Sequence, residues 1–200
     1  MKKYIEMILR KIGVSMLALL IVMTTYFSNS GGSLFLKTKK VQADTGETTL
    51  AMSQAMSRNK IPAIGRAASE GLWAMTAGGH RVFCLNSGKT MCSGDTLKYK
   101  TVNAATYEKK GIAKALQWYF MKSNKNTKAL ALTQAYIWAC GHGANKQNTV
   151  YQAGKNVQKG YSQNDAKKFC ETISDQDPEG TIYYYTVKKC VKKKKLDSHQ

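Results

Sequence analysis

The spacing of the apolar residues changes twice along the chain, and this change restricts the fold more than any other feature. Residues 106–122, 127–143 and 162–174 place apolar side chains at the spacing of one helix face. The runs at 82–85 and 181–191 instead combine short apolar or aromatic stretches with flanking turn residues. The sequence therefore predicts an α+β fold, with strands at both ends and a helical insert between them.

The edges of two segments can be predicted more closely. Ser162 and Asp165 have the spacing of a capping box, which marks the start of the last helix. The polar, irregular stretch 44–60 predicts a linker, with a short helix around 50–57. After the leader described next, the expected parts are a lead-in over 44–70, one domain over 71–191 and a basic tail over 192–200.

The first 43 residues have the composition of a secretory signal peptide. A lysine- and arginine-rich start is followed by a mostly apolar run over 12–27, and Val41 and Ala43 suit a cleavage site after Ala43. The alternative is an uncleaved membrane anchor, because the apolar run is interrupted only by serine and threonine. We expect a secreted protein that resides at the cell surface, and we leave residues 1–43 out of the fold prediction.

The charge of the chain is strongly positive. Its 200 residues include 31 Lys and Arg against 12 Asp and Glu. A nucleic-acid partner is not expected, because a secreted chain seldom meets one. An anionic surface such as a cell-wall polymer is the expected partner for this charge, and the dense basic run 187–200 would contribute most to it.

The chain has an odd number of cysteines, and all of them follow the leader: Cys84, Cys92, Cys140, Cys170 and Cys190. Disulfides are expected in an exported protein. Because the number is odd, one cysteine must be left for other chemistry, and counting does not identify it. The cysteines are too scattered to match a metal-ligand spacing, so no metal or other cofactor is expected.

A glutamine lies within the predicted apolar face of the second helix. Leu130, Gln134, Ile137, Trp138 and Gly141 fall on one stripe of a helix over 127–143. Burying a primary amide without partners costs roughly 1–3 kcal/mol. Two interpretations follow: the amide of Gln134 is hydrogen-bonded to nearby backbone, or it is positioned to react.

Two motifs resemble the thioester domain of Gram-positive bacterial surface adhesins. They are "FCLNSG", which contains Cys84, and "TQAYIW", which contains Gln134; the intervening "GIAKALQWYF" is also similar. The resemblance covers roughly residues 80–175. One difference is that Ala135 and Tyr136 stand where the family more often has any residue followed by alanine. The resemblance implies a small β-sheet or sandwich that carries the Cys84 strand, and a helical insert that carries Gln134.

The resemblance also implies a chemistry. The Cys84 thiol would attack the side-chain carbonyl of Gln134 and expel ammonia, leaving an internal thioester. A lysine amine on a target protein, such as a host surface or matrix protein, would then form an isopeptide bond. This is one covalent event per molecule and not enzymatic turnover. His80 and Thr133 are candidate accessory residues.

Two other functions compete with this one. In the first, a hydrolase or transpeptidase would use Cys84 or Cys140 as nucleophile, with His80 or His142 as base. In the second, the protein is a disulfide-stapled module that binds without covalent chemistry. Cys84 would then pair, for instance with Cys92, and Gln134 would be inert.

Overall fold

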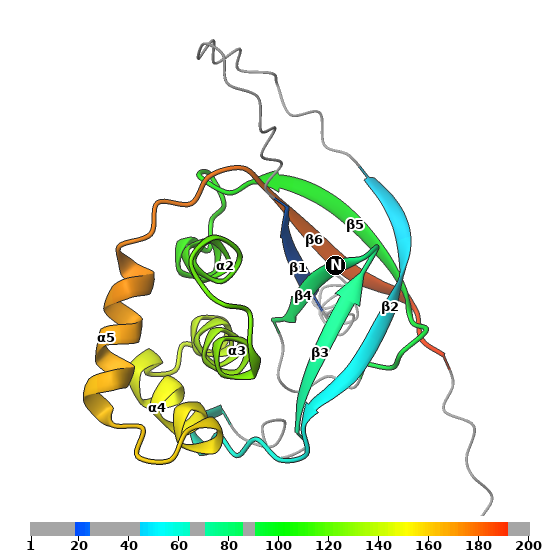
Figure 1. Cartoon of the computed structure of the whole chain (residues 1–200). Helices are drawn as coiled ribbons and strands as arrows, with labels where there is room; N and C mark the ends of the chain where they lie inside the picture. The colour runs from blue at the N-terminus through cyan, green and yellow to red at the C-terminus, as the bar shows by residue number, and fades with distance from the viewer. Residues whose placement is uncertain (1–18, 25–44, 65–70, 86–90, 192–200) are drawn as a thin grey trace, which may run out of the picture.

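The computed structural model describes residues 19–24, 45–64, 71–85 and 91–191. Within this part a curled antiparallel sheet packs against a layer of helices (Figure 1). The prediction of an α+β fold is confirmed. The helical layer is continuous in sequence and lies between strands, as the change in apolar spacing indicated. The predicted basic tail lies outside the described residues.

The sheet consists of antiparallel pairs in the order β1-β4-β3-β2-β5-β6, and it closes because β1 also pairs with β6. Its strands are β1 (Leu19–Thr24), β2 (Thr45–Met56), β3 (Leu72–Ala77), β4 (His80–Cys84), β5 (Thr96–Asn103) and β6 (Thr181–Lys189).

Four α-helices follow one another between β5 and β6, and a short 3-10 turn, η1 (Pro62–Ile64), precedes β3. The helices are α2 (Lys110–Met121), α3 (Thr127–His142), α4 (Lys146–Val157) and α5 (Gln163–Ser174). The α4 helix was not predicted. No helix of the described residues is long and apolar enough to cross a membrane.

The α3 helix is the centre of the helical layer. Every residue from 129 to 139 is buried, because α2 and α4 pack on its flanks and β4 lies beside it. The expected apolar stripe is therefore only part of a helix that is enclosed on all sides, as its largely apolar composition allows. Tyr136 is buried on the side that meets α5, where its ring contacts Phe169 at 6.5 Å between centroids.

The prediction of an irregular linker with a short helix over 44–60 is wrong. Residues 45–56 form β2, which pairs with β5 along its first half and with β3 along its second. The error has a physical cause: this segment has few strongly β-forming residues, and its extended conformation is stabilised by neighbours on both sides. The β2 strand is thus an integral part of the sheet, within the region assigned to the lead-in.

The β1 strand comes from the predicted signal peptide. Its register places Leu20 opposite Cys84 and Leu19–Thr24 opposite residues 181–186 of β6. The structure therefore includes in the sheet six residues that the sequence analysis left out of the fold. Cleavage after Ala43 remains a prediction, and it would separate β1 from β4 and β6.

The capping box predicted for α5 is confirmed, and it leads to a pH-dependent prediction. The Asp165 carboxylate accepts hydrogen bonds from the Ser162 hydroxyl (2.6 Å) and the Ser162 backbone N–H (2.8 Å). These bonds hold the pKa of Asp165 below its ordinary value of 3.8. Because the folded-state pKa is lowered, the contribution of Asp165 to stability is present above the unfolded-state pKa. It is lost as the pH falls through the folded-state pKa.

Ser162→Ala should accordingly raise the pKa of Asp165 toward 3.8, because the hydroxyl bond that lowers it most is removed. The measurement is an NMR titration of the Asp165 side-chain carboxyl. Thr172→Ala is the matched control, since its hydroxyl bonds to the Lys168 carbonyl of the same helix. An Asp165 pKa that does not change in Ser162→Ala would contradict the assignment.

Candidate functional site

Cys84 and Gln134, fifty positions apart in the sequence, meet where β4 approaches α3. The backbone N–H of Cys84 donates to Gln134 Oε1 at 3.0 Å. Gln134 Nε2 in turn donates to the backbone carbonyl of Cys84 at 2.6 Å. The primary amide thus pairs with both backbone groups of Cys84, as a peptide group of a neighbouring strand would. Of the two interpretations of Gln134, the structure shows the hydrogen-bonded amide, and it also brings that amide to the cysteine.

The position of Gln134 explains why the ladder of β3 and β4 stops before Cys84. The hairpin turn at Gly78 and Gly79 has φ values of 58° and 81°, which suit a two-residue turn with both central residues at positive φ. From this turn the ladder continues to the Met75–Val82 pair. Backbone groups two residues apart on a strand point the same way. Cys84 therefore presents its N–H and C=O on the side of the β3 ladder, and Gln134 binds them there.

A second close contact holds α3 against the end of β4. A Cβ atom at Gly141 would lie 2.9 Å from the backbone carbonyl oxygen of Leu85, so only glycine permits this approach. Gly141 lies two turns beyond Gln134 on the same face of the helix. The helix is also defined at both ends, since Asn126 caps its N-terminus and Gly143 ends it in the left-handed region. Gln134 is therefore held at Cys84 by a helix with little freedom to shift.

The surroundings of the pair are apolar and closed to water. Cys84 is 5% exposed and Gln134 is 3% exposed. Cys84 packs in a cluster formed by sheet and helix residues, which includes Val82 of β4 and Ala135 and Trp138 of α3. The Trp138 indole N–H is buried and has no hydrogen-bond partner among the described residues. An amide and a thiol in such a place meet few competing nucleophiles.

Of the candidate accessory residues, His80 lies away from the Cys84–Gln134 pair, whereas Thr133 lies beside it. His80 is exposed at the start of β4, and its ring stacks on Tyr183 at 6.3 Å between centroids. Four residues of extended chain separate its Cα from that of Cys84 by about 13 Å. Thr133 is fully buried beside Gln134 on α3, and its hydroxyl has no hydrogen-bond partner among the described residues. His142, the base considered for Cys140, is exposed at the end of α3.

One polar residue near the sheet was not singled out by the sequence analysis. Asp95 is 1% exposed, and its carboxylate accepts the backbone N–H groups of Cys92 (2.9 Å) and Val191 (2.8 Å). The available sequence signal was the turn "CSGD", in which an aspartate that bonds nearby backbone is common. Asp95 thereby joins the turn before β5 to the end of β6.

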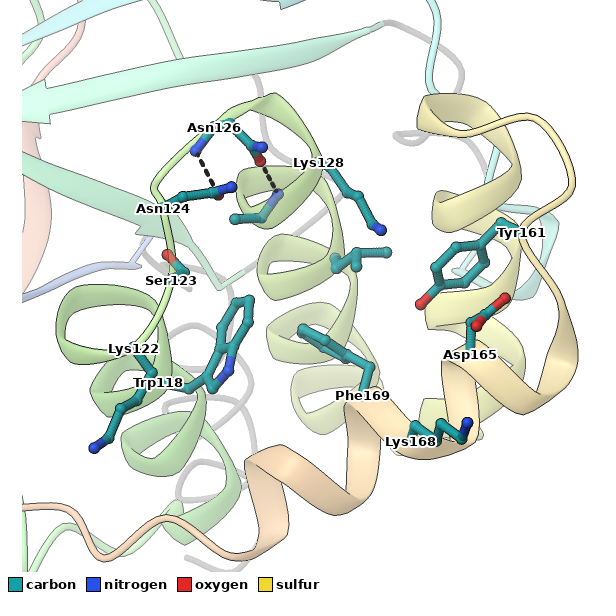
Figure 2. A pocket seen from close by; sticks show the side chains of 12 residues that line it. Trp118, Lys122, Ser123, Asn124, Asn126, Lys128, Tyr161, Asp165, Lys168 and Phe169 are labelled. Atoms are coloured by element: carbon teal, nitrogen blue, oxygen red, sulfur yellow. Dashed lines mark hydrogen bonds between the residues drawn. The ribbon is translucent and has the colours of Figure 1, made fainter.

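A separate pocket lies in the helical layer (Figure 2). It has a volume of about 470 Å³, and the figure shows aromatic rings from Trp118, Phe169 and Tyr161 around it. Its polar lining comes mainly from lysine and asparagine side chains, including Lys122, Lys128, Lys168, Asn124 and Asn126. The residues that line it include neither Cys84 nor Gln134. Phe169 and Tyr161 are buried in the core of the helical layer and Trp118 packs against it, so these rings belong to both the core and the pocket.

Among the described residues, no group of three or more His, Cys, Asp or Glu side chains could hold a metal ion. All five cysteines belong to the described part, and no disulfide joins any two of them there. No protein-family model matches the chain, and the comparisons with curated proteins and with solved structures give no match.

Proposed function

We propose that Cys84 and Gln134 form an internal thioester, through which the protein captures an amine on a target protein. One observation carries this proposal: the Gln134 amide is paired with both backbone groups of Cys84 in a buried site. The acyl carbon is thereby held next to the residue that bears the nucleophile. Such positioning can replace much of the entropic cost of bringing two groups together.

Besides holding the two residues close together, the hydrogen bonds themselves favour the reaction. In thioester formation, the Cys84 sulfur bonds to the side-chain carbonyl carbon of Gln134, and the amide nitrogen leaves as ammonia with the thiol proton. Negative charge develops on Oε1 during the attack, where the Cys84 N–H already donates. A backbone N–H in this position stabilises an oxyanion, as in other acyl-transfer sites. The Cys84 carbonyl accepts from the nitrogen that departs.

The product would store acyl reactivity in an apolar site. A lysine amine on the target attacks the former Gln134 carbonyl, forms an isopeptide bond and releases the Cys84 thiol. Because the acyl group is consumed, each molecule reacts once and does not turn over. The predicted leader and the basic composition are consistent with capture at a cell surface, where the target would be a protein with accessible lysines.

The test is the intact mass of the exported, non-reduced protein before and after methylamine. Thioester formation should lower the mass by about 17 Da, and methylamine should then add about 31 Da at Gln134. Iodoacetamide should label Cys84 only after methylamine, because the thiol is acylated before it. The proposal would be refuted if the Gln134 peptide had the mass of the unmodified amide and iodoacetamide labelled Cys84 before any methylamine treatment.

A second candidate function rests on the pocket of Figure 2. Aromatic rings beside several lysines suit a ligand with a flat apolar face and anionic groups. Such binding would be non-covalent and would survive pretreatment with methylamine, whereas covalent capture would not. Capture that is insensitive to methylamine would favour this function over the thioester.

A further inference from the structure

We propose that the four cysteines other than Cys84 form two structural disulfides, Cys92–Cys190 and Cys140–Cys170. Counting left every pairing open, whereas the structure brings these residues together in two separate places. The inference does not depend on the thioester, since it concerns only where the other four cysteines lie.

The first pair is brought together by Asp95. One carboxylate oxygen binds the N–H of Cys92 and the other binds the N–H of Val191, which directly follows Cys190. Thr96 of β5 is also paired with Lys189 of β6, the residue just before Cys190. The turn before β5 also lies against Val191, since a Cβ atom at Gly94 would be only 3.2 Å from the Val191 side chain. The two cysteines thus flank the same buried carboxylate, and both are accessible enough to be oxidised.

The second pair lies between α3 and α5. Tyr136 precedes Cys140 by one turn of α3, and its ring contacts Phe169, the neighbour of Cys170 on α5. Both thiols pack against the same hydrophobic cluster in the helical layer. Burial raises the pKa of both thiols, and the positive charge of Lys146, which lies near both, partly offsets this rise. Lys146 Nζ is also 5.7 Å from the Tyr136 ring centroid. The two thiols also interact electrostatically with each other.

Pairings that cross between these two places would require large movements. Cys140 and Cys170 are in the helical layer, whereas the start of β5 and the end of β6 lie on the far side of the sheet in Figure 1. Cys84 packs with residues of the sheet, α3 and α4, and its backbone is bound to Gln134 of α3. Cα atoms more than about 7 Å apart cannot be bridged without backbone movement.

Oxidation of each pair needs an external acceptor of two electrons. We propose that a dithiol–disulfide oxidoreductase outside the cell is this acceptor. The protein thiolate attacks the disulfide of the oxidant, and the second protein thiol then displaces a thiol of the oxidant. One protein disulfide forms, and the oxidant is reduced to its dithiol. Cys190 is exposed and should react early. Burial raises the pKa of Cys170 to about 11, so the α3–α5 pair should close more slowly.

The experiment is disulfide mapping of the exported protein, alkylated at acidic pH before digestion, in wild type and in Cys84→Ala. We expect peptides that join Cys92 to Cys190 and Cys140 to Cys170 in both proteins. Any peptide that joins Cys84 to another cysteine, any crossed pair, or four alkylated thiols would overturn the proposal. Methylamine reactivity at Gln134 is read separately, so failure of the thioester leaves this result unchanged.

Thermal unfolding supplies a second readout through a double-mutant comparison. Cys92→Ser and Cys190→Ser should each lower the Tm by about 5–15 °C, and the double variant should lower it no further. Cys92→Ser combined with Cys140→Ser is the matched control, and its two effects should add because each change breaks a different disulfide. Additive effects of Cys92→Ser and Cys190→Ser would contradict the pairing.

Discussion

Cys84→Ala is expected to reduce methylamine incorporation at Gln134 by at least about 100-fold, to the background of an ordinary amide. The physical reason is that a primary amide is a poor acyl donor, and the proposed activation of Gln134 uses the sulfur of Cys84, the residue whose backbone its amide binds. The intact mass should rise to that of the unreacted amide, apart from the substitution itself. Quantitative mass spectrometry of the peptide that contains Gln134 measures both effects.

The control for this prediction is the double variant Cys92→Ala with Cys190→Ala. It removes two thiols near Asp95 and leaves the contact between β4 and α3 intact. Its labelling at Gln134 should equal that of wild type. Labelling of Gln134 that persists in Cys84→Ala would mean that another nucleophile activates the amide, and the thioester proposal would fail.

Gln134→Ala is expected to lower the free energy of unfolding by about 2–5 kcal/mol. The change leaves the backbone N–H and C=O of Cys84 buried without their partners, and each such group costs about 1–3 kcal/mol. A cavity in the packed interior adds to the loss. The comparison is made in the Cys84→Ala background, so that loss of hydrogen bonds is not confused with loss of a covalent cross-link. Denaturant unfolding followed by circular dichroism gives the values.

Thr133→Val in the same background is the matched control. Thr133 is adjacent on α3 and fully buried, but its hydroxyl has no hydrogen-bond partner among the described residues. Its replacement should change the free energy of unfolding by no more than about 1 kcal/mol, because no bond is lost. If Gln134→Ala and Thr133→Val cost the same, the pairing with the Cys84 backbone does not stabilise the fold.

The helices illustrate what local sequence can predict. The α3 and α5 helices begin and end close to the expected residues, because each is built from contacts between residues three or four apart and from caps such as Ser162. The α4 helix escaped prediction, since its sequence is largely polar and only Thr149, Val150, Ala153 and Gly154 are buried. The α4 helix is held by packing against α3 and α5, and its own sequence carries no signal of that packing.

The sheet shows the opposite case. The β2 strand looks polar and irregular alone, and it becomes a strand because β3 and β5 supply hydrogen bonds on its two sides. Likewise, β1 is apolar enough to be predicted as part of a leader, and its pairing with β4 and β6 involves partners more than fifty residues away. Strand formation depends on neighbours that a local pattern does not reveal.

The sequence by itself determined the α+β class, the extent of most helices and the two motifs that single out Cys84 and Gln134. Only the tertiary structure decided how these two residues meet: the β3–β4 ladder stops at Val82, and a side-chain amide from α3 binds the Cys84 backbone. It alone also placed Asp95 between Cys92 and Val191. The physical reason is the same in both places, because a buried hydrogen bond between distant segments exists only once the fold has brought them together and excluded water.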